Sequence, residues 1–190
     1  PVSASATTSP NKVHTYEGKK PYEEARAITH DDIQRILGDY ATATRNALRA
    51  GFDGVQLHGA NGYLIDQFLR DGTNLRTDDY GGSVENRARL MLEVTAAVAA
   101  EIGAGRTGIR ISPVTPAGGI SISDPQPQYD HIVAELDKLG LAYLHVVEGA
   151  TGGPRDVAPF DYAALRKAFS GTYIANNGYD QQMAEDALAQ

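Results

Sequence analysis

The stretch that decides the fold is Gly51-Phe52-Asp53-Gly54-Val55-Gln56-Leu57-His58-Gly59-Ala60-Asn61-Gly62-Tyr63-Leu64. Its apolar residues, Val55 and Leu57 among them, predict a strand that is covered on both faces. An imidazole, a carboxamide and a phenol follow at the carboxyl end of this strand, in His58, Asn61 and Tyr63. Catalytic groups collect at that end of the strands in α/β folds. These three proton donors therefore indicate a site that receives negative charge on a substrate oxygen.

The composition is that of an ordinary globular domain. The chain has 190 residues, of which 42% are hydrophobic and 22% charged, enough for one sizeable core. A net charge of −7 argues against nucleic acid and anionic membrane surfaces as partners, because both require a basic patch. No apolar run approaches the roughly 18 to 20 residues of a membrane span. The absence of cysteine excludes disulfides and thiolate chemistry within the chain and fits a reducing, cytoplasmic location.

The chain divides into an N-terminal arm and a series of alternating elements. Residues 1–28 show neither helical nor strand periodicity, and we expect them to form a loop or arm. Over residues 29–190, apolar residues at three- and four-residue spacing alternate with short apolar runs. The pattern predicts helices at about 29–50, 64–69, 83–102, 129–139, 160–169 and 180–189, and strands at 52–58, 107–112, 141–147 and 173–175. Thr29 and Ser83 are expected N-caps.

Strands that alternate with helices predict right-handed βαβ units and a parallel sheet. Loops that are long after the strands and short before them are typical of a (β/α)8 TIM barrel, whose functional loops share one face. A complete barrel takes about 250 residues, and the pattern contains only about half the strands. We therefore predict an α/β fold of TIM-barrel type with about four βα units, an incomplete barrel domain over residues 1–190. The chain begins without methionine and ends inside a predicted helix, as expected for part of a longer barrel.

Further runs extend the opening motif in both directions. They are Pro1-Val2-Ser3-Ala4-Ser5-Ala6, Gln67-Phe68-Leu69-Arg70-Asp71-Gly72-Thr73-Asn74, Arg76-Thr77-Asp78-Asp79-Tyr80-Gly81-Gly82-Ser83-Val84-Glu85-Asn86-Arg87-Ala88-Arg89-Leu90, Gly108-Ile109-Arg110-Ile111-Ser112-Pro113 and Ala142-Tyr143-Leu144-His145. Together with residues 51–64 they resemble the old yellow enzyme family of FMN-dependent ene-reductases. The resemblance covers nearly the whole chain, and the block at 51–90 is highly specific.

The resemblance implies roles for the three donors. His58 and Asn61 would bind the carbonyl or nitro oxygen of the substrate and form an oxyanion hole, in which each donor lowers the barrier by about 3 to 4 kcal/mol at most. Tyr63 would protonate the α-carbon after hydride from the reduced flavin has added to the β-carbon. A phenol holds its proton at neutral pH and is ready to act as an acid. Some family members carry a second histidine where this chain has Asn61, and either residue supplies a donor.

The resemblance also implies an FMN site. Arg110 matches an arginine near flavin N1 and O2, where a fixed cation favours the anionic reduced flavin. Asn176, Asn177 and Gly178 match the backbone cradle of the FMN phosphate, although the family often has more glycine there. NAD(P)H would bind transiently over the flavin, since the sequence has no glycine-rich dinucleotide loop. No residues have the spacing of a metal site.

Some conspicuous residues have structural explanations. The charged run from Arg76 to Arg89 is expected to lock the long loop to the start of the helix at 83–102. His145, in a predicted strand, is expected to belong to the core. Arg110 requires a ligand or a buried carboxylate partner, because a charge that points into a core is costly unless it is paired.

The leading hypothesis is an NAD(P)H-dependent FMN ene-reductase. It would reduce the activated C=C of α,β-unsaturated carbonyl or nitro compounds, with nitrate esters as a further substrate class. One alternative is a non-catalytic half-barrel that binds a complementary barrel half or forms a homo-oligomer through its open sheet edges. Another is a phosphate-binding barrel lyase or isomerase that uses His58 and Tyr63 as acid and base.

Overall fold

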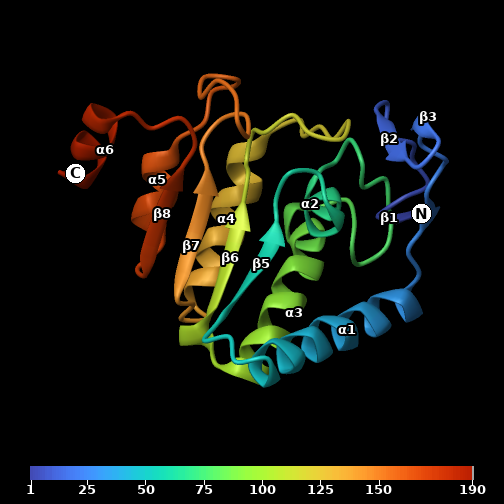
Figure 1. Ribbon diagram of the computed structural model, residues 1–190, viewed down its shortest axis with the longest axis horizontal. Helices are drawn as coiled ribbons and strands as arrows, with labels where there is room; N and C mark the ends of the chain where they lie inside the picture. The colour runs from blue at the N-terminus through green and yellow to red at the C-terminus, as the bar shows by residue number, and fades with distance from the viewer. Residues whose placement is uncertain (190) are drawn as a thin grey trace.

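A four-stranded parallel sheet organises the computed structural model, which describes residues 1–189 (Figure 1). The strands lie in the order β5 (Val55–Gly59), β6 (Thr107–Ile111), β7 (Tyr143–Val147) and β8 (Thr172–Asn176). Sequence order and spatial order coincide, as successive βαβ units require. The α/β class is confirmed, and the sheet does not close into a barrel within the described residues.

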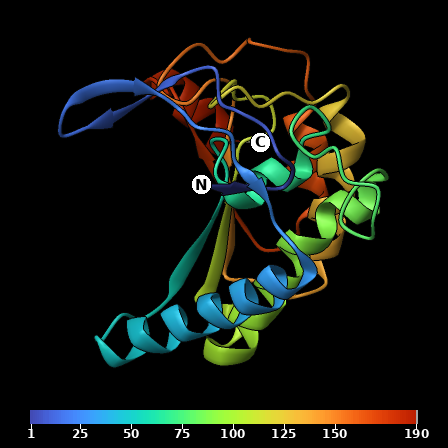
Figure 2. The same cartoon turned by 90° about the vertical axis from the view of Figure 1, so that its right-hand side faces the viewer.

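The described residues form six α-helices. They are α1 (His30–Arg49), α2 (Leu64–Leu69), α3 (Val84–Ile102), α4 (Pro125–Asp137), α5 (Tyr162–Ala168) and α6 (Gln181–Leu188), with a 3-10 turn at Ala104–Arg106. Helices α3, α4 and α5 lie behind the strands, and α1 packs along α3 (Figures 1 and 2). Helix α4 begins several residues earlier than its apolar spacing predicts, because Pro125 stands in the first turn, where its missing N–H costs nothing.

Local signals set the ends of the longest helices. Thr29 caps α1 in a reciprocal capping box with Asp32. The Ser83 side chain accepts a hydrogen bond from the backbone N–H of Asn86 at the start of α3. Both N-caps that the sequence predicts are therefore confirmed. None of the helices among residues 1–189 has the length and apolar character that a bilayer crossing requires.

The core lies between the sheet and its helices. Leu57, Ile109 and Leu144 are buried on the helix side of three neighbouring strands, and Met91 and Val98 of α3 belong to the same cluster. Each such side chain stabilises the fold by roughly 1.5 to 3 kcal/mol relative to exposure. The alternate residues of the same strands face the other way, and this face carries the polar groups.

The N-terminal arm contains strands that the sequence analysis missed. Strands β2 (Lys12–Thr15) and β3 (Gly18–Pro21) form an antiparallel hairpin, and β1 (Val2–Ser3) pairs with β4 (Arg26–Ala27). The expectation of a loop was wrong at the hairpin, which projects from the body in Figure 2. Its residues are largely exposed, so no apolar alternation marks them.

Arg76 fastens this arm to the body. Its guanidinium pairs with Asp78 and donates hydrogen bonds to the carbonyl oxygens of Ala4 and Ile28, which lie at either end of the arm. Arg87, farther along the same charged run, donates to the carbonyl oxygen of Leu69, in α2. Arg89 of α3 donates to the carbonyl oxygen of Asp79 at 2.6 Å, so the run joins the long loop to α3 as expected, while Arg76 binds the arm instead.

Replacing Arg76 by alanine should loosen the arm. Because hydrogen bonds to charged groups contribute about 1.5 to 3 kcal/mol, we expect the free energy of unfolding to fall by about 2 to 3 kcal/mol. The amide hydrogens of Arg26 and Ile28, which bond to Pro1 and Ser3, should exchange faster with deuterated solvent. Arg35→Ala, which removes an exposed arginine on α1, is the control. Unchanged exchange in Arg76→Ala would mean that strand pairing alone holds the arm.

Candidate active site

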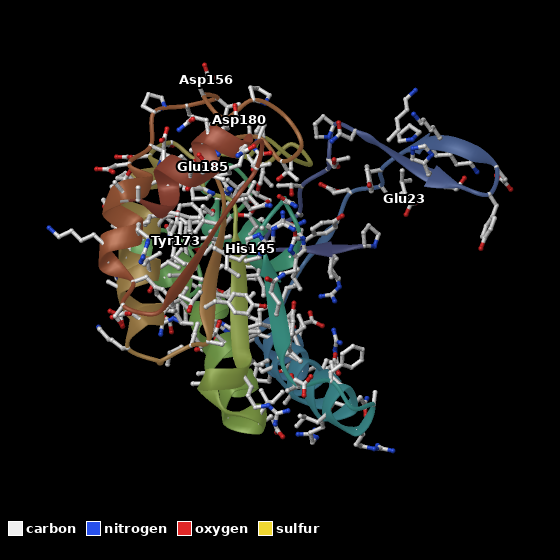
Figure 3. The ribbon with its side chains drawn as sticks, turned by 60° about the vertical axis from the view of Figure 1, so that its left-hand side comes forward. Glu23, His145, Asp156, Tyr173, Asp180 and Glu185 are labelled. Atoms are coloured by element: carbon white, nitrogen blue, oxygen red, sulfur yellow. The ribbon has the colours of Figure 1, made fainter. Side chains whose placement is uncertain are left out.

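The sheet face that points away from the helices carries aligned rows of side chains. In the pairing register of β5 to β8, one row consists of His58, Arg110, His145 and Ile174. Figure 3 labels His145 near the middle of the sheet. His58 and Arg110 each stand one residue before the end of their strands. The row therefore lies toward the carboxyl edge, where the sequence predicts the site.

A second row lies nearer the amino ends and supports the first. Its members are Gln56, Gly108, Tyr143 and Thr172. A side chain at Gly108 would collide with the Tyr143 ring, since a Cβ there would lie 2.2 Å from it. Gln56 Oε1 lies 3.0 Å from Nδ1 of His145. His145 is half-buried on the sheet face away from the helices, in the row of His58 and Arg110, so the expectation that it belongs to the core was wrong.

A tight turn after β5 brings the predicted donors together. Asn61 adopts the left-handed conformation, with φ of 58°, and its backbone N–H bonds to Ser112 Oγ at 2.8 Å. Tyr63 is the N-cap of α2, and its ring lies 5.1 Å from the His58 ring, centroid to centroid. The Tyr63 side chain is 62% exposed. The turn therefore sets the imidazole beside the phenol, with Asn61 on the segment between them.

A buried ion pair supports this turn from below. Asp66 and Arg70 are 0% and 2% exposed, and Arg70 Nε lies 2.8 Å from Asp66 Oδ1. Asp66 Oδ2 accepts the backbone N–H of Gly62 at 3.0 Å. Arg70 also donates to the carbonyl oxygens of Ser112 and Pro113, at 2.6 and 2.8 Å. The pair thus joins the turn after β5 to the end of β6.

Sequence reasoning missed this pair. The hydroxyl of Tyr129 completes it by donating to Asp66 Oδ1 at 3.2 Å. Burial alone would lower the pKa of Arg70, but Tyr129 and Asp66 outweigh burial and the net shift is upward. The four-residue spacing of Asp66 and Arg70 on a helix was the available signal. Nothing local shows that this face of α2 is buried.

Burial and the charge of Arg110 together lower the pKa of the neighbouring imidazoles. Partial burial lowers the pKa of His58, and the positive charge of Arg110 lowers it further. The same two causes lower the pKa of His145. A neutral imidazole has one N–H donor and one acceptor nitrogen. His58 can therefore donate one hydrogen bond to a substrate at neutral pH.

The arginine itself has no carboxylate partner. Its Nη2 donates to Asn176 Oδ1 at 3.1 Å, while its buried Nε has no hydrogen-bond partner among residues 1–189. A buried N–H without a partner costs free energy. Of the two partners that the sequence analysis allowed, a buried carboxylate is excluded within the described residues. The geometry fits an acceptor atom on a bound molecule.

Of the three residues expected at the FMN phosphate, Asn176 ends β8, and Asn177 and Gly178 begin the turn that leads to α6. Asn177 and Gly178 have positive φ angles of 109° and 64°. The side chain of Asn177 bonds the loop after β7, where it donates to the carbonyl oxygen of Glu148 at 2.8 Å. Asp180 caps α6 by accepting the N–H of Met183 at 2.8 Å. The turn itself, rather than the first turn of α6, is thus the part that can cradle an anion.

A second ion pair beside this turn was also missed by the sequence analysis. Glu148 is nearly buried, pairs with Arg155 and accepts a hydrogen bond from the Tyr179 hydroxyl at 2.7 Å. Arg155 also donates to the carbonyl oxygen of Asn177 at 2.7 Å. Pairing neutralises the carboxylate charge next to the turn. No group of three or more His, Asp or Glu side chains that could hold a metal occurs in the described part of the chain.

A cleft of about 1100 Å³ separates the N-terminal arm from the turn after β5. Its lining includes Asn61 and Tyr63 on one side and Lys12, Lys19 and Tyr22 of the arm on the other. Two of the three predicted donors therefore face an open space of small-molecule size.

Solved structures of full-length proteins show the same fold. The chain superposes on an old yellow enzyme homologue from Zymomonas mobilis with a TM-score of 0.95 and 46% identity, covering 100% of this chain and 54% of the other. Morphinone reductase in complex with tetrahydroNAD gives a TM-score of 0.90 and 40% identity, covering 100% of this chain and 52% of the other.

Curated relatives agree with the structural match. Chanoclavine-I aldehyde reductase of Penicillium roqueforti (strain FM164) is 46% identical over 166 residues, which cover 86% of this chain and 45% of the relative. The 12-oxophytodienoate reductase 1 of Oryza sativa subsp. japonica is 44% identical over 172 residues, covering 88% of this chain and 45% of the relative. The chain spans about half the length of the curated relatives it matches.

The fold and these matches define a flavin-dependent oxidoreductase class. Residues 2–190 match the family described as NADH:flavin oxidoreductase / NADH oxidase. The chain belongs to this family, as a partial chain of the old yellow enzyme type. The family uses FMN as its cofactor, with NAD(P)H as the reductant.

The charge of Arg110 should be visible in the titration of His58. Since Arg110 lowers the pKa of His58, Arg110→Gln should raise that pKa toward the ordinary 6.5 of histidine. Followed by the His58 Cε1 proton in NMR spectra, the titration midpoint should lie below 6.5 in the unaltered chain and move upward in the variant. Arg45→Gln on α1 is the control. If the pKa of His58 were the same in Arg110→Gln and in Arg45→Gln, burial alone would account for its lowered value.

Proposed function

We propose that the complete protein is an NAD(P)H-dependent FMN ene-reductase built on a (β/α)8 barrel. It reduces the activated C=C of α,β-unsaturated carbonyl and nitro compounds, and nitrate esters are a further substrate class. The proposal is carried by the contact of the His58 and Tyr63 rings at 5.1 Å, next to Asn61 and at the carboxyl edge of the sheet. Family membership supports the same chemistry.

His58 and Asn61 bind the substrate oxygen in this proposal. Reduction of the C=C places negative charge on that oxygen as an enolate or nitronate. Because His58 is neutral, it donates one N–H, and Asn61 donates from Nδ2. Fixed donors aimed at a developing oxyanion contribute about 3 kcal/mol each to lowering the barrier. The hydrogen bonds also orient the C=C against the cofactor.

Tyr63 supplies the proton. Among residues 1–189 its hydroxyl has no protein hydrogen-bond partner, and its exposed ring lines the cleft. The Oη–H bond breaks as a C–H bond forms at the α-carbon, so the enolate becomes a neutral carbonyl compound and the negative charge passes to the tyrosine oxygen. The proton is then regained from solvent. Contact with His58 limits where the ring can lie.

When bound, reduced FMN would supply the hydride that adds to the β-carbon, and NAD(P)H would then reduce the flavin again. The residues present fit this cofactor. Arg110 offers its unpartnered Nε and a positive charge toward a flavin acceptor, while Asn176 keeps the guanidinium in place. The turn at Asn177 and Gly178 offers backbone N–H groups to the phosphate. The paired state of Glu148 limits its repulsion of that anion.

The overall reaction can be followed by the absorbance of the flavin. In the complete protein, NADPH should bleach the flavin band and 2-cyclohexenone should restore it under anaerobic conditions. A protein that binds no FMN would contradict the proposal and favour a lyase or isomerase. A flavin that NADPH reduces but no enone or nitroalkene reoxidises would contradict the substrate class.

Replacing Tyr63 by phenylalanine should separate the two half-reactions. The variant lacks only the acidic hydroxyl, so reoxidation by 2-cyclohexenone should slow by about 100-fold or more. Reduction by NADPH should change little, because it needs no proton from Tyr63. Rapid-mixing absorbance measures both rates. Tyr16→Phe, at the exposed tip of the hairpin, is the control, and an equal loss in both half-reactions would contradict the acid role.

A further inference from the structure

We infer that Thr151 is a positioning residue for Asn61. Its hydroxyl holds the carboxamide in the orientation that turns Nδ2, the donor atom, toward the substrate oxygen. The inference rests on the proposed function, in which Asn61 acts as a donor. It adds a residue from a different loop, distant in the sequence, to the substrate site.

One short contact carries the inference. Thr151 Oγ1 donates to Asn61 Oδ1 at 2.6 Å, across 90 residues of sequence. A carboxamide has an acceptor oxygen on one side and an NH2 donor on the other. When the hydroxyl engages Oδ1, the NH2 group is left for another partner. Among residues 1–189, Asn61 Nδ2 has no protein acceptor.

The backbone of Asn61 is already fixed by other contacts. Its N–H bonds to Ser112 Oγ, and the next N–H along the chain, that of Gly62, bonds to Asp66. The side-chain amide torsion is the remaining freedom, and such torsions are soft and roughly two-fold. A half-turn would present Oδ1 to the substrate oxygen and replace an attraction by a repulsion. The hydrogen bond that Thr151 donates to Oδ1 stabilises the orientation that turns Nδ2 away from Thr151.

The loop that carries Thr151 is itself anchored on both sides. Before it, the Thr115 hydroxyl donates to the carbonyl oxygen of Gly149 at 2.7 Å. After it, the N–H of Gly152 bonds to Asn177 Oδ1 at 3.2 Å. The same loop continues to Asp156, which Figure 3 labels at the top of the molecule, beyond the carboxyl ends of the strands. An exposed threonine is thus held in a defined place.

The inference also connects two parts of the site. Asn177, in the turn expected to cradle the FMN phosphate, holds the loop at Glu148 and Gly152. Thr151 stands between these two contacts and reaches Asn61. Substrate donor and phosphate turn therefore share one loop, although they belong to strands at opposite edges of the sheet.

Two substitutions distinguish a hydrogen bond from packing. Thr151→Val keeps the shape and removes the donor, whereas Thr151→Ser keeps the donor and removes a methyl group. In the complete FMN-loaded protein, we expect Thr151→Val to weaken para-nitrophenolate binding and to lower kcat/KM for 2-cyclohexenone by about 3- to 10-fold, as loss of one hydrogen bond predicts. Thr151→Ser should stay within about 2-fold of the unaltered protein. Calorimetry measures the first quantity and steady-state kinetics the second.

A double-mutant cycle tests the route of the effect. If Thr151 acts through Asn61, Thr151→Val should have no further effect in the Asn61→Ala background. Additive losses would overturn the inference, as would a Thr151→Val protein that binds para-nitrophenolate normally. A larger loss in Thr151→Ser than in Thr151→Val would assign the residue to packing and overturn it as well.

An NMR measurement separates this inference from the proposed function. The side-chain NH2 signals of Asn61, assigned by their loss in Asn61→Ala, should shift in Thr151→Val and remain in place in Thr151→Ser without any substrate. Unmoved signals in Thr151→Val overturn the positioning role whatever the activity. A protein that shows the shift but reduces no enone keeps the contact and contradicts the proposed function instead.

Discussion

The site depends on the buried pair of Asp66 and Arg70. Removing one partner of such a pair leaves an uncompensated charge in the core, which costs about 3 to 5 kcal/mol. The pair is tied to the backbone of two different loops, at Gly62 after β5 and at Ser112 and Pro113 after β6. Because both loops are anchored to the same rigid group, the turn that carries the donors keeps its place relative to the sheet.

Arg110 differs from two other arginines near the site, the buried Arg70 and the half-buried Arg155. Arg70 and Arg155 each have a carboxylate partner, so their charges are satisfied within the chain. Arg110 has an amide partner and an unpartnered Nε. Its charge therefore remains available to a ligand, and it also keeps the neighbouring His58 neutral. In the proposed function, this residue offers a cation to the cofactor and helps burial to keep His58 a neutral donor.

Contacts between loops, more than the strands, give the site its shape. Asn61 and Asn177 both have positive φ angles, and both use their side chains to bond the loop after β7. Asparagine tolerates this backbone region better than most residues, and its carboxamide can accept and donate at once. Loops from β5, β7 and β8 are thereby joined at the carboxyl edge.

The sequence alone determined the alternation of strands and helices, the caps at Thr29 and Ser83, and the placement of the donors at the carboxyl end of β5. These features depend on residues within a few positions of one another, so periodicity and capping report them. Tertiary structure alone decided the hairpin in the arm, the burial of Arg70, the Arg110–Asn176 contact across 66 residues and the Thr151–Asn61 contact across 90. The reason is physical. The hairpin is local but exposed, so no apolar alternation marks it, whereas the other contacts depend on strand register and loop packing between distant segments and leave no periodic trace in either.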